Sequence, residues 1–246
     1  MAHALASPSS AERWFKCAGS VLANADMPYE TSLAAANGTL IHSMTEMLLK
    51  DRLRDMTLRD YWVGRKEVVE EFEIEVDEEM INCAEVYVDY ILKREEELGA
   101  RRVIEEKVYL NEISDKCYGT ADCILLAENR ICVIDLKSGK WAVDPVKNKQ
   151  LMIYGLGALS RYGNEDTTME LTIVQPRGFH PDGPVRTWDI SAVDLVEWGY
   201  ESLKQATDAC AEEEPEYNFG DHCRFCNAKA KCPVYQDLTK IGEKYE

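Results

Sequence analysis

Four cysteines constrain the fold of this 246-residue chain more than any other feature. Cys17 lies near the start of the chain, whereas Cys223, Cys226 and Cys232 lie close together near its end. Three thiolates in one short loop can converge on a single metal centre, and a fourth ligand from the other end would tie the two ends together. This arrangement predicts either a cuboidal iron–sulfur cluster or a structural zinc ion.

Cysteine usage and the start of the chain indicate a reducing compartment. The chain has nine cysteines, an odd number, and residues 1–8 lack the basic patch and apolar run of a secretory signal. No apolar stretch approaches the ~20 residues that cross a bilayer. We therefore expect a soluble cytoplasmic protein without membrane contact, whose thiols serve a metal. His222, next to Cys223, leaves a zinc site of mixed cysteine and histidine ligands open.

The net charge of −17 at first disfavours a nucleic-acid partner, because phosphate binding normally requires a basic face. Between Glu67 and Glu97, however, thirteen acidic residues stand against two basic ones. This segment contributes −11, which leaves −6 for the remainder of the chain. We expect this acidity on a solvated helical region, and part of the rest is needed to hold divalent cations. The composition therefore permits DNA as a substrate.

Hydrophobic periodicity predicts an α/β fold with a mixed central sheet flanked by helices. Helices are expected at residues 11–17, from about residue 38, and at 77–98, 148–160 and 194–210. Strands are expected at residues 103–110, 119–127, 131–137, 170–175 and 184–190. The short turn between the second and third strands predicts an antiparallel hairpin. The sequence contains no glycine-rich phosphate loop with a lysine, which argues against a nucleotide-binding fold.

Two aspartates, a lysine and a histidine predict a hydrolytic metal site. Asp122 and Asp135 flank the predicted hairpin, so adjacent strands can place them side by side. Asp135 and Lys137 are two residues apart and emerge on the same face of a strand. Two carboxylates, a backbone carbonyl and the imidazole of His42 suit magnesium or manganese. Lys137 can orient an attacking water beside such a metal, which indicates hydrolysis of a phosphodiester.

A lone Asp-x-Lys tripeptide is common and is usually an exposed pair on an edge strand. The ordered set in this chain is much rarer. It runs through Gly119-Thr-Ala-Asp122, an apolar stretch into Asp135 and Lys137, and then Gln150 and Tyr154, one turn apart on the next helix.

This set resembles the PD-(D/E)XK nuclease superfamily, in particular its RecB-like branch, whose Gly-x-x-x-His helix motif is matched by Gly38 and His42. The resemblance implies a restriction-endonuclease-like core with a mixed central sheet. It also implies a metal site formed by His42, Asp122, Asp135 and the Leu136 carbonyl. The implied catalytic residues are Asp122, Asp135, Lys137, Gln150 and Tyr154, with Gln150 and Tyr154 positioning Lys137 and contacting a phosphate or base. Residues 1–246 would form a single nuclease domain, with a helical part at 1–100, a nuclease core at 101–210 and a cysteine tail at 211–246.

The spacing of Cys17, Cys223, Cys226 and Cys232 resembles the iron–sulfur subset of this superfamily, which includes the AddB nuclease domain and the CRISPR-associated spacer-acquisition exonucleases. The resemblance implies a [4Fe–4S] cluster that staples the termini of the fold. The length of the chain is similar to that of standalone phage or prophage nucleases. The resemblance therefore implies a Mg²⁺- or Mn²⁺-dependent DNA exonuclease that acts in phage or prophage recombination in a bacterial cytoplasm. DNA, single-stranded or with duplex ends, and a phage annealing protein or a helicase are the implied partners.

Two other functions remain open from the sequence. The first is a non-catalytic iron–sulfur module that binds DNA or assembles with a recombination partner. The complete set of His42, Asp122, Asp135 and Lys137 argues against it, because a module without chemistry has no need of all four. The second is a redox sensor, which only the cysteines support. The colour of the purified protein distinguishes a cluster from zinc.

Overall fold

The computed structural model describes residues 4–25, 27–28, 31–50 and 57–242. The chain divides into two compact units, each assembled from segments that are distant in the sequence. The sheet unit comprises Glu30–Val108 and Thr120–Val193, and the terminal unit comprises Met1–Tyr29, Tyr109–Gly119 and Asp194–Glu246. In the described part of the chain, no helix combines the length and the apolar character needed to cross a membrane.

A five-stranded mixed sheet forms the centre of the sheet unit, in the order β3-β4-β5-β6-β7. The strands are β3 (Arg101–Tyr109), β4 (Tyr118–Leu126), β5 (Arg130–Leu136), β6 (Thr168–Val174) and β7 (Val185–Ser191). Strand β5 pairs antiparallel with β4 and parallel with β6, while β7 is antiparallel to β6. The parallel pair needs a long crossover, which α6 (Lys149–Tyr162) supplies. The predicted mixed sheet and the predicted β4–β5 hairpin are confirmed.

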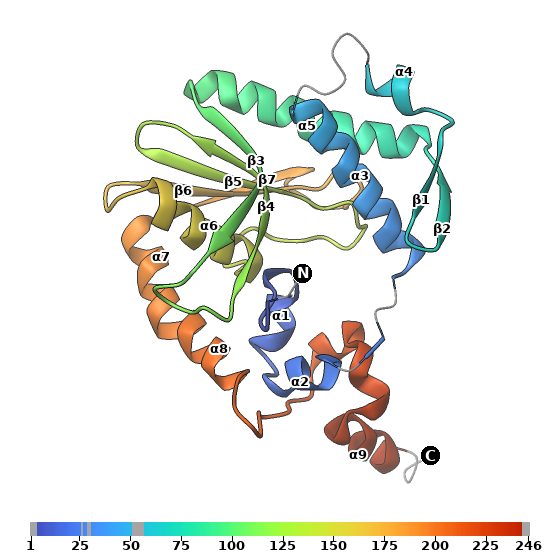
Figure 1. The fold of residues 1–246 in the computed structure, drawn as a ribbon, viewed down its shortest axis with the longest axis vertical. Coiled ribbons are helices and arrows are strands. Elements are labelled where there is room, and N and C mark those ends of the chain that lie inside the picture. The colour runs from blue at the N-terminus through green and yellow to red at the C-terminus, as the bar shows by residue number, and fades with distance from the viewer. Residues whose placement is uncertain (1–3, 26, 29–30, 51–56, 243–246) are drawn as a thin grey trace. The chain divides into compact units, whose positions relative to one another are not determined.

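Helices cover both faces of this sheet (Figure 1). Cys132, Ile134 and Leu136 alternate along β5 and join one core with α3 (Leu33–Leu49) and α5 (Glu78–Leu98). The intervening residues of β5 point to the opposite face, where α6 packs. Asp135 therefore emerges on the α6 side of the sheet.

Local capping fixes where these helices begin. The side chain of Ser32 accepts a hydrogen bond from the Ala35 N–H, so α3 starts five residues before the predicted position near Gly38. Asp77 caps α5 through the Met80 N–H, and Asn148 caps α6 through the Leu151 N–H. Both of these helices lie within two residues of their predicted bounds.

A small hairpin next to α3 and a short helix next to α5 were not expected from the sequence. Strands β1 (Lys66–Val69) and β2 (Phe72–Glu75) pair antiparallel, and α4 (Leu58–Trp62) contacts α5. Each strand has only four residues, and apolar and acidic residues alternate in β2 but not in β1. Such short runs carry little periodic signal.

The terminal unit is helical. Its elements are η1 (Pro8–Ser10), α1 (Ala11–Trp14), α2 (Gly19–Ala25), α7 (Ala192–Trp198), the π-helical stretch η2 (Gly199–Leu203), α8 (Lys204–Ala209), η3 (Asp221–Phe225), η4 (Asn227–Lys231) and α9 (Pro233–Gly242). The helix expected at 194–210 is thus interrupted by a π-helical turn. The Gly19 N–H donates to the Glu216 carbonyl at 2.8 Å, and a Cβ at Gly19 would meet the Tyr217 ring at 2.7 Å. This close contact holds the segment after Cys17 against the tail.

Candidate functional site

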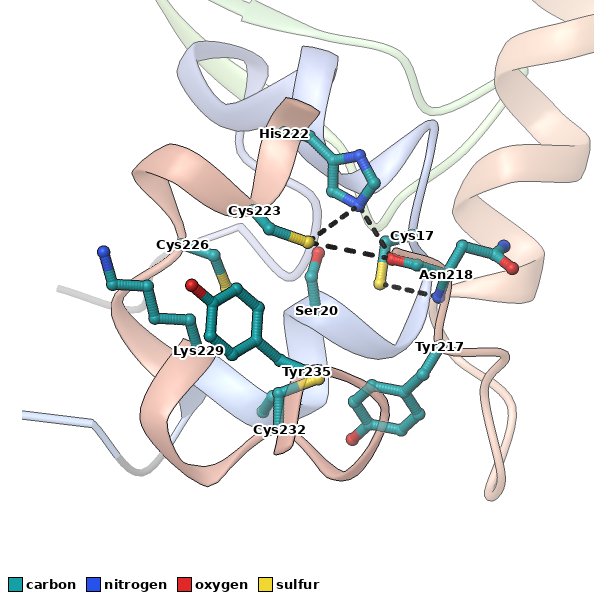
Figure 2. A pocket seen from close by; sticks show the side chains of 11 residues that line it. Cys17, Ser20, Tyr217, Asn218, His222, Cys223, Cys226, Lys229, Cys232 and Tyr235 are labelled. Atoms are coloured by element: carbon teal, nitrogen blue, oxygen red, sulfur yellow. Dashed lines mark hydrogen bonds between the residues drawn. The ribbon is translucent and has the colours of Figure 1, made fainter. Parts of the chain in front are cut away.

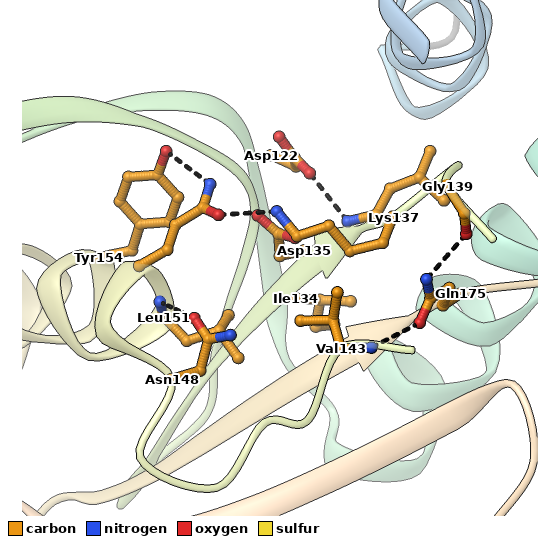
Figure 3. Close-up of polar contacts among 12 residues, drawn as sticks. Asp122, Ile134, Asp135, Lys137, Gly139, Val143, Asn148, Leu151, Tyr154 and Gln175 are labelled. Atoms are coloured by element: carbon orange, nitrogen blue, oxygen red, sulfur yellow. Dashed lines mark hydrogen bonds and ion pairs between the residues drawn. The ribbon is translucent and has the colours of Figure 1, made fainter. Parts of the chain in front are cut away.

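The predicted lysine lies in a chain of polar contacts between β5 and α6 (Figure 3). Lys137 Nζ is 2.8 Å from Asp135 Oδ2, and Asp135 is only 2% exposed. Lys137 Nζ also donates to Gln150 Oε1 at 2.7 Å, and Gln150 Nε2 donates to the Tyr154 hydroxyl at 3.2 Å. Burial raises the pKa of Asp135, although the neighbouring Lys137 opposes this rise. The four residues therefore form one connected group.

Asp122 joins this group to helix α3. Its Oδ2 accepts a hydrogen bond from the Leu136 N–H at 2.9 Å, one step beyond the last β4–β5 pair, Cys123 with Ile134. Its Oδ1 lies 3.5 Å from Nδ1 of His42. Because the N–H and C=O of one strand residue point to the same side, the Leu136 carbonyl also faces β4. Asp122 thus contacts both His42 and the backbone of Leu136.

Glu105 also reaches this site, although the sequence favours exposed strand charges for Glu105 and Glu106. Its carboxylate, His42 and Asp122 each offer a ligand atom within 4.8 Å of the others. Glu105 has a positive φ of 55° inside β3, and a positive φ is uncommon for a residue other than glycine. Its neighbour Glu106 instead pairs with Arg161 and Tyr162. A residue with positive φ interrupts the regular alternation of side chains along the strand. The alternation therefore does not predict which of the two adjacent glutamates faces the site.

Neighbouring carboxylates raise the pKa values of both Glu105 and His42 in this site. Burial, together with the charges of Asp122 and Glu46, raises the pKa of Glu105 to about 6. Burial lowers the pKa of His42, but the charge and hydrogen bond of Asp122 outweigh it and raise that pKa to about 9. A divalent cation would relieve the repulsion between these carboxylates. The donor set of carboxylate oxygens and one imidazole therefore fits magnesium or manganese.

Close packing positions His42 opposite the strand residues. A Cβ at Gly38 would come within 2.8 Å of Ser138 Oγ, so glycine lets α3 approach the end of β5. His42 lies one turn further along the same helix. Beside it is a hollow of about 400 Å³ that opens to the surface. Its lining consists of Ala34, Ala35, Gly38, Thr39, His42, Glu105, Asp122 and Ser138.

Two buried polar residues hold the loop that follows Lys137, and no sequence pattern indicates their role. Gln175 accepts from the Val143 N–H at 3.0 Å and donates to the carbonyls of Gly139 and Trp141 at 2.8 and 2.7 Å. Arg186 donates to Gln175 Oε1 at 2.6 Å and to the Val143 carbonyl. Gln175 is fully buried and Arg186 is 5% exposed. These side-chain hydrogen bonds fix the path of the loop, which has no regular secondary structure of its own.

The four predicted cysteines line one pocket of the terminal unit (Figure 2). Cys17 and Cys226 are buried, whereas Cys223 and Cys232 are partly exposed. Asn218 N–H lies 3.4 Å from Cys17 Sγ, and Asn24 Nδ2 lies 3.3 Å from Cys226 Sγ. Donors directed at sulfur stabilise thiolate charge, so the pocket fits a cluster or metal held by thiolates.

His222 bears on the kind of metal centre. It lines the same pocket, with Nε2 3.7 Å from Cys223 Sγ and 2.9 Å from the Asn218 carbonyl oxygen. An imidazole beside four thiolates keeps zinc, held by cysteine and histidine, as the alternative to a cluster held by four cysteines.

Comparison with known proteins assigns the chain to a family. The profile of the family described as "Protein of unknown function (DUF2800)" matches residues 3–245. The chain belongs to the DUF2800 family. A solved structure, "Crystal structure of SSO0001", is similar over 92% of this chain and 96% of its own, with 14% identity and a TM-score of 0.39. At that level of similarity we draw nothing from it about the fold or the function of this chain.

Proposed function

We propose that this protein is a Mg²⁺- or Mn²⁺-dependent DNA exonuclease of the PD-(D/E)XK superfamily, with a structural [4Fe–4S] cluster. One observation carries the proposal. Lys137 Nζ is held at 2.8 Å from buried Asp135 and 2.7 Å from Gln150, and Asp122 connects this group to His42 and Glu105. A surface ion pair on an edge strand would show neither the burial nor the converging ligands.

Five groups of this site would hold the cation. His42, Glu105 and Asp122 supply the three converging ligand atoms, and Asp135 and the Leu136 carbonyl are the further ligands implied by the superfamily. When bound, a divalent cation neutralises charge on phosphate oxygens and lowers the pKa of a coordinated water.

Lys137 is the residue suited to act on the water and the phosphate. A lysine ammonium carries three N–H donors. Two of these are directed at Asp135 and Gln150, which fixes the direction of the third. A donor fixed in advance stabilises developing negative charge without reorganisation during the reaction. Gln150 and Tyr154, on consecutive turns of α6, hold Lys137 in this position.

The cysteines would act on structure rather than on the reaction. Cys17 comes from the N-terminal segment and the other three come from the tail, so a shared cluster would connect two ends of the terminal unit. Because a cluster binds only the folded arrangement, its binding energy adds to the stability of that unit.

Digestion of end-labelled DNA tests the proposal. Protein purified without oxygen is incubated with single-stranded and blunt duplex DNA in Mn²⁺ or Mg²⁺. We expect metal-dependent shortening, which Asp122→Asn lowers by about 10²–10⁴-fold. The matched control is Asp89→Asn, an exposed aspartate on α5, which keeps full activity. If cluster-loaded wild-type protein leaves every substrate whole, the catalytic proposal fails. Binding without cleavage would then favour the DNA-binding module.

A further inference from the structure

Residues 138–149 form a loop, called the site loop below, whose two ends lie at the candidate site. The hydrogen bond of 2.7 Å from Lys137 Nζ to Gln150 Oε1 closes the base of this loop. Gln175 fixes its backbone through the Gly139 carbonyl at 2.8 Å (Figure 3). Side chains carried by the site loop are therefore held in a fixed position next to the candidate site.

The site loop is basic, although the chain as a whole carries a net charge of −17. Three lysines, Lys140, Lys147 and Lys149, stand against a single acidic residue, Asp144. The carboxylate of Asp144 accepts a hydrogen bond from the Val146 N–H at 2.8 Å and so takes part in the turn of the loop itself. The loop thus has a surplus of positive charge.

Two of these lysines have no acidic partner. Lys140 and Lys147 are exposed, and in the part of the chain that the structure describes neither ammonium forms an ion pair with a carboxylate. By contrast, the exposed lysines Lys66 and Lys93 of the same unit each pair with a glutamate. On a protein with a large excess of carboxylates, two unpaired lysines on one short loop create a local positive potential.

The stability of the fold does not explain these charges. Lys147 and Lys149 flank Asn148, which caps the start of α6, and a cation is unfavourable at the N-terminal end of a helix. Lys147 also has a positive φ of 56°, a conformation that glycine or asparagine adopts more readily. A lysine at this position therefore has another role than stabilising the turn or the helix.

The position of the loop decides which anion it fits. A strand whose phosphate lies at a cation held by Asp122 and Glu105 carries further phosphates on either side of it. Lysine ammonium groups bind such phosphates without reading the bases, since the backbone is the same in every sequence. Trp141, on the same loop, is 68% exposed and offers a surface for a sugar or a base.

We propose that Lys140 and Lys147 bind backbone phosphates of the nucleic-acid strand on one side of the phosphate at the cation, with Trp141 against the same strand. The inference rests on the proposed nuclease function and adds a binding surface outside the metal site. Because paired and unpaired strands share the same backbone, this surface holds both. The two lysines contribute to binding and leave the chemical step unchanged.

Removal of the two charges tests this surface. The variant is Lys140→Gln with Lys147→Gln, which keeps side chains of similar length. The matched control is Lys66→Gln with Lys93→Gln, which removes the same charge from two exposed positions of the same unit. Thermal unfolding of both double variants is compared with that of the wild type to verify the fold.

The salt dependence of binding is the first readout. Fluorescence anisotropy measures the binding of a labelled oligonucleotide with Ca²⁺ over a series of salt concentrations. The slope of log K against log salt should become less steep by about 1 for each lysine lost, which is about 2 for the loop variant. Trp141→Ala should weaken binding roughly 5- to 100-fold without changing the slope, because the ring carries no charge.

Digestion with Mn²⁺ is the second readout. We expect the loop variant to raise KM roughly 10-fold and to keep kcat at saturating DNA, because phosphate contacts away from the reacting bond contribute only to binding. Lys66→Gln with Lys93→Gln should stay within about twofold of the wild type in both constants. A fall of kcat in the loop variant would contradict the proposal, because the lysines would then act in the reaction.

The possible failures are distinguishable. If the wild type cleaves DNA but the loop variant matches the control in salt slope and KM, the surface is wrong and the nuclease proposal stands. If the slope changes in the loop variant alone but no protein cleaves, the surface stands and the nuclease proposal fails. A wild type that neither binds nor cleaves DNA overturns both. Equal losses in the two double variants would show an effect of net charge and also contradict the surface.

Discussion

Lys137, the residue directly after β5, donates a hydrogen bond to Gln150 on α6 at 2.7 Å, and this contact joins the end of the strand to the crossover helix. Gln150 also donates to Tyr154 one turn later, so α6 presents two polar side chains to a single lysine. The direction of the Lys137 ammonium is thus decided by how α6 packs on the sheet.

Replacing Gln150 should affect the rate more than substrate binding. Gln150→Leu removes the partner of Lys137, and we expect kcat to fall roughly 10- to 100-fold with little change in KM, as for other residues that position a catalytic group. Gln150→Glu keeps the acceptor oxygen and should retain more activity. Steady-state kinetics on single-stranded DNA provide the check. An equal loss in both variants would show that the acceptor is not what matters.

Glu105 should make the metal-free protein less stable as the pH rises. Its folded pKa of about 6 lies above the usual value of 4.5, so the folded state binds the extra proton. Its contribution to stability is complete below pH 4.5 and is lost as the pH rises through about 6. Because Glu105 is partly exposed and solvent screens its interactions, we expect the free energy of unfolding to fall by only about 1 kcal/mol.

Glu105→Gln tests this balance directly. In EDTA at pH 7.5 the variant should be more stable than the wild type by about 1 kcal/mol in urea unfolding, because it cannot ionise. Added Mn²⁺ should stabilise the wild type and have a smaller effect on the variant, because a carboxylate ligand is lost. Identical stabilisation of both proteins by Mn²⁺ would remove Glu105 from the ligand set.

Gly157 should be required for α6 to pack on β3. A Cβ at this position would stand 2.4 Å from the Cβ of Val108, and neither atom can rotate away. We expect Gly157→Ala to cost about 1–3 kcal/mol of stability through overpacking, although alanine favours the helix. Gly139→Ala is the control, because a Cβ there meets nothing within 4 Å. Activity should fall with Gly157→Ala, since α6 carries Gln150 and Tyr154.

The cysteine pocket should give a coloured protein. We expect anaerobically purified wild type to be brown and to absorb near ~400 nm, as thiolate-bound iron–sulfur clusters do. Cys226→Ser should lose this absorbance and lower the thermal stability. Cys210→Ser, a buried cysteine of the same unit outside the pocket, should keep the absorbance. A colourless wild type that contains one zinc ion per chain would establish the zinc alternative.

Much of the fold follows from local sequence. Apolar periodicity placed the five strands of the central sheet and helices α5 and α6, and the β4–β5 hairpin followed from its short turn. The two-residue spacing of Asp135 and Lys137 placed both side chains on one face because strands alternate. These features depend on contacts between residues that are close in the sequence. The β1–β2 hairpin was not predicted, because each of its strands has only four residues and shows too little periodicity.

The sequence by itself determined which side chains could form the site, and the tertiary structure decided which of them meet. Glu105 enters the site only because the backbone takes a positive φ inside β3, which no alternation pattern reveals. Gln175 donates hydrogen bonds to Gly139 and Trp141, which lie more than 30 residues before it in the sequence. Arg186 supports the same loop through Gln175 and Val143. The approach of Gly38 to Ser138 is likewise a contact between distant segments. Such contacts depend on how the sheet and its helices pack, and that packing is set by the whole core rather than by any one segment.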